Sequence, residues 1–430
     1  MTNLLHPRDE IVATIARVYR HRMTTTSGGN VSVMEPNGDV WITPARVDKG
    51  RLNRTDIVRI FPDGTREGVH PPSSEYPFHL GIYKARPDLH AIIHAHPGAL
   101  VSFSICGQIP DTRLFPQARQ VCGPVGFAKY ALPGSEQLGR HIAAVFAADR
   151  DCHCVLLENH GVVIAGEDLA TAFERFETLE FAAETILNAR TLGPDVHYLT
   201  ENQLEMAQAG CTLLIEQVMA PPSSIEKELR KQICDFVHRA YEQRLMTSTE
   251  GSFSARTGAD EFIITPSRVD RRRLELGDLV PVREGARASG QFPSRAARLH
   301  RAIYRQHPDI HAIVNALPVH ATAFAVSDFQ LDTRTIPESY LFLKDVRKIP
   351  FELHYGSGSE VAHAVTPEHP VALLENNGVL VAGRSVLDAF DRLEVLDATA
   401  DAILRGRVLG PLTPMPPEVI DELAAAFPGV

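Results

Sequence analysis

The sequence predicts an α/β protein built from two homologous domains in tandem. Its 430 residues are too many for one ordinary core and suit two domains of about 200 residues each. The segment "SSEYPFHLGIYKARPDLHAIIHAHP" at 73–97 returns at 293–318 as "PSRAARLHRAIYRQHPDIHAIVNALP". Around both copies, apolar runs typical of strands alternate with stretches of helical periodicity. The chain therefore reads as one α/β unit present twice.

The repeat extends along most of the chain. Each copy opens with apolar residues at helical spacing that run into a Ser/Thr/Gly turn, at 11–33 and 233–255. A β-rich segment closed by a proline follows, "VWITPARVDKGRL" and then "FIITPSRVDRRRL". Later, "LLENHGVVIAG" is answered by "LLENNGVLVAG", and each predicts a buried strand, a turn, a second strand and a long helix. We expect domains at 1–194 and 225–430, with 195–224 as the linker.

Composition narrows the functional class. The chain is 44% hydrophobic and 22% charged, with a net charge of −10. The negative charge argues against nucleic acid or a membrane surface as the main partner. The first residues show no signal peptide, and no stretch is apolar enough to span a bilayer. Cys152 and Cys154 are the only close cysteines, and two residues of separation suit buried reduced thiols better than a disulfide. A cytoplasmic protein with a small-molecule substrate is expected.

Ligand chemistry gathers in the first copy. In "AIIHAHP" the period of a strand places His94 and His96 on one face, which makes half of a metal site. An ordinary polar face at the end of a strand gives the same pattern, so the pair alone does not decide. Glu75, after two serines, and His160, before Gly161, add ligand-type side chains at turns, where functional groups tend to be presented.

The second copy serves as an internal control. All four candidates change together in it: Glu75 to Ala296, His94 to Asn315, His96 to Leu317 and His160 to Asn377. By contrast, His79 and His90 are matched by His300 and His311, which favours a structural role for those two. Joint loss is expected when a metal site decays, because a partial ligand set is worth little. We therefore expect about one divalent ion per chain, bound by the first copy.

The order of the motifs "SGGN", "ITP", "PSSE", "HAH" and "NHG" resembles the class II aldolase/adducin family, typified by L-fuculose-1-phosphate aldolase. The resemblance covers residues from about 8 to about 192 with all its marks, and from about 227 to about 409 as a degenerate copy. It implies an α/β/α sandwich around a mostly antiparallel sheet. It also implies assembly as a fourfold ring with sites between subunits.

The resemblance implies roles for single residues. His94, His96 and His160 would bind a divalent ion, usually zinc, and Glu75 would be both a ligand and the acid/base. Tyr130 in "FAKYALPGS" matches a tyrosine thought to donate a proton across a subunit boundary; a packed aromatic is the alternative. Imidazole and carboxylate ligands also suit Mn²⁺ and Fe²⁺, so the native ion stays open.

This chemistry predicts a carbon–carbon lyase. A bound cation would polarise a carbonyl and stabilise the enediolate left when a neighbouring C–C bond breaks, while a carboxylate moves the proton. Three imidazoles leave coordination positions open for a hydroxy-carbonyl or hydroxy-acid substrate. A metal-dependent decarboxylase of a hydroxylated acid is the first alternative. An adducin-like interaction module without an ion is the second, and we prefer that role for the second copy.

One departure from the family bears on the substrate. Its phosphate-binding aldolases cradle the anion with glycine-asparagine, threonine-glycine and two serines. The residues retained here are Gly29, Asn30, Ser73 and Ser74, but Ala45-Arg46 replaces threonine-glycine. The Arg46 guanidinium suits a planar carboxylate, which supports the decarboxylase alternative. Because Arg268 stands at the same place in the second copy, a purely structural arginine is equally open.

The duplication also predicts assembly. Two tandem chains would build a pseudo-fourfold ring in which intact and degenerate domains alternate, so we expect a homo-oligomer and most simply a homodimer. Degenerate-domain residues such as Arg295 or His354 would then complete a neighbour's site. His354 pairs with Tyr130 when the copies are aligned on "GSE".

Overall fold

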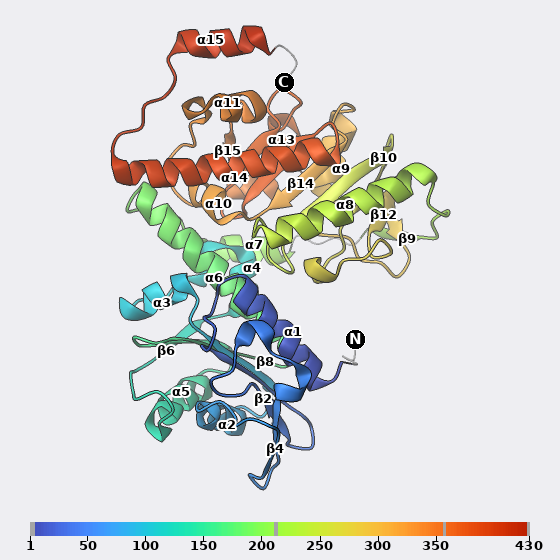
Figure 1. The fold of residues 1–430 in the computed structure, drawn as a ribbon. Helices are drawn as coiled ribbons and strands as arrows, with labels where there is room; N and C mark the ends of the chain where they lie inside the picture. The colour runs from blue at the N-terminus through green and yellow to red at the C-terminus, as the bar shows by residue number, and fades with distance from the viewer. Residues whose placement is uncertain (1–4, 210–213, 356–357, 428–430) are drawn as a thin grey trace. The chain divides into compact units, whose positions relative to one another are not determined.

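A computed structural model describes residues 5–209, 214–355 and 358–427 of the chain (Figure 1). It divides into two compact units. Unit 1 holds Met1–Thr112 and Gln117–Glu184, and unit 2 holds Arg113–Pro116 and Thr185–Val430. Each unit contains one mixed, mostly antiparallel sheet with helices packed on it. The predicted duplication of an α/β fold is confirmed.

Unit 1 is built on a sheet of order β4-β3-β2-β1-β5-β8-β7-β6, counted over the described residues. All neighbours in it are antiparallel except β6 and β7. Its strands are β1 (Asn30–Met34), β2 (Val40–Ile42), β3 (Val58–Ile60), β4 (Arg66–Glu67), β5 (Ala91–Ala95), β6 (Val125–Ala128), β7 (Cys154–Leu157) and β8 (Gly161–Gly166). Its helices are α1 (Pro7–Arg20), α2 (Tyr76–Ala85), α3 (Gly98–Ile105), α4 (Pro116–Cys122), α5 (Glu136–Ala148) and α6 (Leu169–Leu192), of which α4 and α6 cross the division between units.

Helices α2 and α5 cover one face of this sheet, and α1 and α3 pack on the strands as well. The buried core under α2 and α5 includes Phe78 and Ile82 from α2, Phe146 from α5 and Ile92 from β5. Side chains alternate along a strand, so His94 points to the same face as Ile92. Its ring accordingly lies edge-on to Phe78, with ring centroids 5.5 Å apart. His94 on β5 is therefore packed against the first turn of α2.

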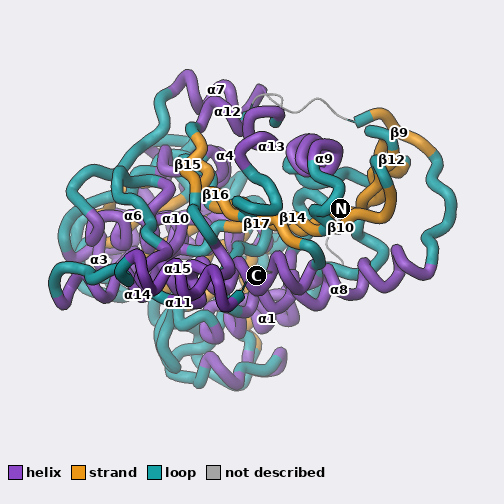
Figure 2. Tube along the Cα trace, turned by 90° about the horizontal axis from the view of Figure 1, so that it is seen from above, coloured by secondary structure: helices purple, strands orange, loops and turns teal. Residues whose placement is uncertain are grey.

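Unit 2 repeats the plan around a sheet of order β15-β16-β17-β14-β10-β11-β12-β13-β9, again over the described residues. Its strands are β9 (Ile215–Gln217), β10 (Ser252–Gly258), β11 (Glu261–Ile264), β12 (Val280–Arg283), β13 (Ala286–Ala288), β14 (Ala312–Ala316), β15 (Arg347–Ile349), β16 (Val371–Leu374) and β17 (Val379–Gly383). Its helices are α7 (Glu201–Ala209), α8 (Ser224–Glu242), α9 (Ala297–Gln306), α10 (Val319–Ala325), α11 (Pro337–Leu343), α12 (Phe351–His354), α13 (Ser359–Ala364), α14 (Val386–Leu409) and α15 (Pro417–Ala426). Figure 2 shows this sheet with α9 and α13 on one side and α8 and α14 on the other.

The two units share unusual backbone positions. Three non-glycine pairs have positive φ at matching places: Arg22 and Arg244, Arg46 and Arg268, and Asn159 and Asn376. Such left-handed residues are uncommon outside glycine. Their recurrence in a copy without the four candidate ligands indicates that the fold, rather than the site chemistry, requires these turns.

The segment at 195–224, expected to be the linker, contains regular structure within unit 2. Helix α7 packs with Phe351 through Leu199, Leu204 and Ala207. Strand β9 pairs in parallel with β13 at the edge of the second sheet.

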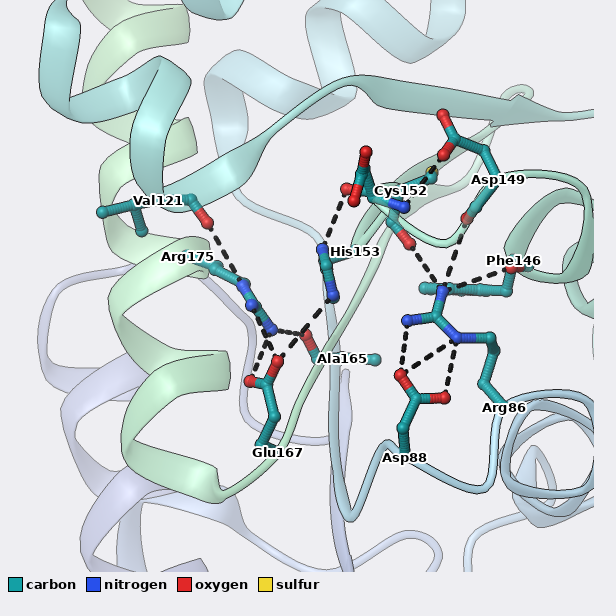
Figure 3. A network of polar contacts seen from close by, with 11 residues as sticks. Arg86, Asp88, Val121, Phe146, Asp149, Cys152, His153, Ala165, Glu167 and Arg175 are labelled. Carbon is teal, nitrogen blue, oxygen red and sulfur yellow. Dashed lines mark hydrogen bonds and ion pairs between the residues drawn. The ribbon is translucent and has the colours of Figure 1, made fainter. Parts of the chain in front are cut away.

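Two arginines fasten helices to the first sheet (Figure 3). Arg86, at the end of α2, donates to both carboxylate oxygens of Asp88 and to the backbone carbonyls of Phe146, Asp149 and Cys152. Arg175 on α6 donates to the carbonyl of Ala165 at 2.8 Å and to Glu167. Through these contacts Arg86 ties the end of α2 to α5 and to the segment before β7, and Arg175 ties α6 to β8.

The described cysteines are all free: Cys106 is exposed, and Cys122, Cys152, Cys154 and Cys234 are buried. Burial raises the pKa of Cys152 to about 11, which keeps it a neutral thiol. Among the described helices, none is both long enough and apolar enough to cross a membrane.

Candidate metal centre

Three histidines from two neighbouring strand ends meet in unit 1. His94 lies in β5, His96 follows that strand, and His160 ends the turn between β7 and β8. Their candidate ligand nitrogens all lie within 4.8 Å of one another. They converge because β5 and β8 are antiparallel neighbours, with His94 opposite Val163. Among the described residues, no other group of three or more metal-type side chains is as closely gathered.

The backbone around the cluster leaves little freedom. A Cβ at Gly161 would lie 2.6 Å from the carbonyl oxygen of Ala95 and 2.7 Å from Cδ2 of His96, so only glycine fits next to that ring. The backbone N–H of His160 donates to Ser104 Oγ at 3.1 Å. The Nδ1–H of His94 faces the carbonyl oxygen of Val162 at 3.0 Å, which leaves Nε2 as the lone-pair nitrogen toward the cluster.

Glu75 reaches the cluster from the N-cap position of α2. Its Oε2 lies 3.2 Å from His94 Nε2, and its Oε1 lies 3.6 Å from His160 Nε2. Asn30 Nδ2 donates to Oε2 at 2.8 Å, and the backbone N–H of Glu75 donates to Ser73 Oγ at 3.3 Å. The structure thus brings together all four candidate ligands named from the sequence.

The electrostatics favour neutral rings at His96 and His160 beside an ionised Glu75. Burial, followed by the nearby His94 and His160, lowers the pKa of His96 to about 3. Burial likewise lowers the pKa of His160 to about 4. For Glu75, burial acts to raise the pKa, but His94, His160 and the Asn30 hydrogen bond outweigh it and hold the pKa well below its usual value. These are the protonation states that coordinate metal ions.

The donor set fits a divalent cation. Three of its buried atoms have no hydrogen-bond partner: Glu75 Oε1, His94 Nε2 and His96 Nε2. Although His94 Nε2 lies near Glu75, the contact does not have the geometry of a hydrogen bond. Buried polar atoms are seldom left unpaired, so their clustering calls for a missing partner. Three imidazole nitrogens and one carboxylate oxygen suit zinc, and they also suit manganese or iron.

The residues expected to bind a substrate anion differ in exposure. Gly29 has φ +70°, and a Cβ there would lie 2.8 Å from the carbonyl oxygen of His94. Ser73 is buried and Ser74 is exposed. Arg46 is exposed in the left-handed conformation, and the neighbouring Ala45 N–H bonds the Pro71 carbonyl at 3.0 Å, which places this loop beside the Pro-Pro-Ser-Ser segment.

Tyr130 stands apart from the cluster in the described contacts. Its side chain is 53% exposed, and its backbone N–H donates to Glu158 Oε2 at 2.9 Å. No hydrogen bond of the described residues joins its hydroxyl to Glu75 or the histidines. In unit 2 the matching His354 is buried, and its Nε2 bonds the carbonyl of Glu375 at 3.0 Å.

One contact at the site was not foreseen. The sequence placed Asn30 in an anion cradle, yet its side chain is 2% exposed and is bonded to Glu75. The contact between Asn30 and Glu75 follows from the pairing of strands, because Asn30 sits directly opposite His94 in the β1–β5 pair. That register is visible only once the sheet order is known.

Comparison with known proteins agrees with this geometry. The profile of the "Class II Aldolase and Adducin N-terminal domain" family matches residues 9–187 and again 231–404. The chain is 34% identical to the L-fuculose phosphate aldolase of Methanocaldococcus jannaschii over 185 residues, covering 42% of this chain and 96% of that protein. It is 30% identical to the 3-oxo-tetronate 4-phosphate decarboxylase of Haemophilus influenzae over 210 residues, covering 48% of this chain and 97% of that protein.

A third relative is the 5-deoxy-D-ribulose 1-phosphate aldolase of Bacillus thuringiensis, which is 31% identical over 202 residues, 46% of this chain and 92% of that protein. Each of these relatives aligns with less than half of this chain over nearly its own full length. That ratio is expected when one chain contains two copies of a single-domain fold. Two profile matches, two sheets of the same plan and the histidine cluster lead to one conclusion: the chain belongs to the class II aldolase/adducin family.

Proposed function

We propose that unit 1 is a divalent-metal-dependent carbon–carbon lyase acting on a small hydroxy-carbonyl or hydroxy-acid substrate. The observation that carries this proposal is the joint placement of three histidines and Glu75, with unpaired buried atoms turned toward one another. When bound there, a divalent cation would supply Lewis acidity toward a substrate oxygen. Unit 2 would contribute fold and contacts rather than chemistry, because alanine, asparagine and leucine replace these groups.

The chain's own residues would divide the remaining work. His94, His96 and His160 would hold the cation, and the hydrogen bond from His94 to Val162 would keep that ring in its orientation. Glu75 has one oxygen bonded to Asn30 and one without a hydrogen-bond partner. The free oxygen is available to remove or return a proton when a C–C bond beside a carbonyl breaks or forms. The buried setting limits competing exchange with water.

Aldol cleavage is the first candidate reaction and decarboxylation is the second. Both leave an electron pair on the carbon beside a carbonyl, so one site can serve either. The relatives include sugar-phosphate aldolases and an oxo-tetronate phosphate decarboxylase. Arg46 favours the second candidate, because its exposed guanidinium suits a carboxylate at the place where threonine-glycine was expected.

Metal content tests the site directly. The purified chain should bind about one zinc, manganese or iron ion, measured by elemental analysis after dialysis against each metal. His94→Ala and His160→Ala should lose the ion and the lyase activity. The matched variants Asn315→Ala and Asn377→Ala in unit 2 should keep both. A stoichiometry near two ions per chain would contradict the assignment of unit 2 as degenerate.

The reaction is then decided by product analysis. Hydroxy-carbonyl phosphates and hydroxy acids are offered to the metal-loaded chain, and release of an aldehyde or of carbon dioxide is measured. An aldehyde product supports aldol cleavage, and carbon dioxide supports decarboxylation. We further propose that the working form is a homodimer, which light scattering on the full chain can test. A monomer with full activity would count against it.

A further inference from the structure

We propose that Asn30 is a positioning residue which holds Glu75 as a hydrogen-bond acceptor, and that His79 and Ser32 behind it set the orientation of the Asn30 amide. This inference rests on the proposed function, since it gives Glu75 its working geometry. It assigns Asn30, His79 and Ser32 roles that differ from binding substrate.

A continuous series of buried hydrogen bonds runs from Tyr83 to Glu75. Tyr83 Oη lies 2.7 Å from Ser32 Oγ, and Ser32 Oγ lies 2.7 Å from His79 Nδ1. His79 Nε2 lies 2.5 Å from Asn30 Oδ1, and Asn30 Nδ2 lies 2.8 Å from Glu75 Oε2. Ser32 and His79 are fully buried, and Asn30 is 2% exposed. The series therefore leads from the core under α2 to the carboxylate without access to solvent.

The direction of the bonds follows from donor chemistry. An ionised Glu75 only accepts, so Asn30 must present its Nδ2 and keep Oδ1 for His79. The proton of a neutral His79 then sits on Nε2, and its Nδ1 accepts from the Ser32 hydroxyl. Burial lowers the pKa of His79 to about 3, in keeping with the neutral ring. Each donor thus points toward Glu75, and reversal of the Asn30 amide would set two acceptors against each other.

Unit 2 shows which of these hydrogen bonds are common to both copies of the fold. Tyr304, Ser254 and His300 repeat the first two contacts at 2.7 Å each. His300 Nε2 then bonds Oδ1 of Asn315, the residue at the place of His94, at 2.6 Å. Ser252 occupies the position of Asn30 there, opposite Asn315 in the strand pair. The tyrosine-serine-histidine part survives without a glutamate, whereas the asparagine link to a carboxylate occurs only in unit 1.

Kinetics can distinguish two roles for Asn30, the orientation of Glu75 and the binding of a substrate anion. Its Oδ1 is engaged with His79, and one of its two Nδ2 hydrogens with Glu75, which fixes the plane of the amide beside the carboxylate. A residue that orients the acid/base affects turnover, while one that holds substrate equally in ground and transition states affects KM. The Glu75 oxygen that lacks a hydrogen-bond partner is the one that Asn30 leaves free.

The first test compares Asn30→Ala and Asn30→Asp in the metal-loaded full chain. We expect Asn30→Ala to lower kcat by about 10–100-fold and to change KM by less than about threefold. Asn30→Asp keeps the shape and the bond from His79 but places a like charge beside Glu75, so its kcat should fall at least as far. A raised KM with unchanged kcat, or an Asn30→Asp variant as active as wild type, would overturn the proposal.

The second test uses the duplicate as a matched control. Ser32→Ala and Ser254→Ala remove equivalent buried hydroxyls, so both should lower Tm by similar amounts. Only Ser32→Ala should lower kcat, by up to about tenfold. Equal kcat in the two variants would show that the contacts behind Asn30 serve the fold alone.

Zinc affinity, measured by competition with a chelating dye, keeps the two hypotheses separate. Asn30→Ala should weaken it by about tenfold, because the carboxylate is no longer held beside the histidines. If wild type turns over no substrate yet Asn30→Ala shows this weakening, the lyase proposal fails and the positioning role stands. If wild type is active and Asn30→Ala matches it in both affinity and kcat, the positioning role fails and the lyase proposal stands.

Discussion

Leu317 fills in unit 2 the place that His96 holds in unit 1. A Cβ at Gly378 would lie 3.0 Å from Leu317 Cγ, just as one at Gly161 would approach the His96 ring. Glu250 and Arg295, which occupy the positions of Gly28 and Ser74, form an ion pair at 3.7 Å. In unit 2, alanine, leucine and two asparagines thus occupy the four candidate-ligand positions, while the matching turns keep their left-handed residues.

The first prediction concerns Glu75. Glu75→Gln keeps the shape of the side chain and an oxygen for the Asn30 donor, but it cannot carry a proton between states. Turnover should therefore fall by about 10²–10⁴-fold, while elemental analysis finds most of the metal retained by the histidines. Undiminished turnover in a metal-loaded Glu75→Gln protein would rule out the acid/base role.

The second prediction concerns Arg46, for which Arg268 is the matched control. Both are exposed with φ 57°, so replacement by alanine should cost each unit a similar small loss of stability. If Arg46 binds a substrate anion, Arg46→Ala alone should raise KM, and Arg46→Lys should restore it only in part because a bidentate contact is lost. Steady-state kinetics and thermal melts decide this. Unchanged KM in Arg46→Ala would leave the arginine a structural role.

The sequence predicted which residues form the candidate site better than it predicted the contacts between them. The duplicate pointed to Glu75 and the three histidines as candidate ligands, because all four changed together in the second copy, and the structure places the four side chains close together. It could not reveal the bond between Asn30 and Glu75, since a contact between residues 45 positions apart depends on which strands pair and in what register. For the same reason, His79 was expected to be structural from its match with His300, and its contact with Asn30 was not anticipated.

The turn between β7 and β8 shows how an element presents the candidate ligand His160. Asn159 takes φ 56° and His160 then lies over Gly161, whose missing Cβ leaves room for His96. Unit 2 repeats the turn with Asn376 and Gly378. This element was predicted correctly as strand, turn and strand, because its apolar runs and its glycine are local features.

The third prediction follows from this turn. In Gly161→Ala the added methyl meets the Ala95 carbonyl and the His96 ring, so the strands or the ring must shift. We expect a loss of about 1–3 kcal/mol in the free energy of unfolding, as for other overpacked sites, together with weaker metal binding. Urea unfolding and metal titration measure the two effects. Wild-type metal affinity in this variant would show that the His96 ring does not need this clearance.

Short elements were the least predictable. Strand β9 has three exposed residues, Ile215–Gln217, and such a length carries no periodicity. Only the presence of an open edge on β13 gives it a partner. The segment was therefore expected to be a linker from its position outside the repeat.

The fourth prediction concerns acid stability of the whole chain. In unit 2, burial lowers the pKa of His300 to about 4 and of His354 to about 4. An unfolded histidine titrates near 6.5, so below that pH the unfolded chain binds more protons than the folded one. The free energy of unfolding should therefore fall as pH drops from about 6.5 toward 4, by up to about 1.4 kcal/mol per pH unit for each histidine.

Urea unfolding at pH 7 and pH 5 measures this effect. The single tryptophan, Trp41, lies buried in unit 1, so its fluorescence reports on that unit, and circular dichroism reports on both. The transition seen by circular dichroism but not by fluorescence should move to lower urea at pH 5. A transition of unit 2 at the same urea concentration in both buffers would contradict the burial of neutral histidines.

Strand β9 also determines at which residue a soluble fragment of unit 2 can begin. Without it, β13 would present unpaired backbone N–H and C=O groups, a template on which other chains can aggregate. The matching edge in unit 1 is β4, whose two residues, Arg66 and Glu67, are exposed and charged and so discourage such pairing. A fragment that starts at residue 225 should therefore precipitate more readily than one that starts at 195. On this prediction, residues 195–224 limit the aggregation of unit 2 by covering the edge of β13 with β9.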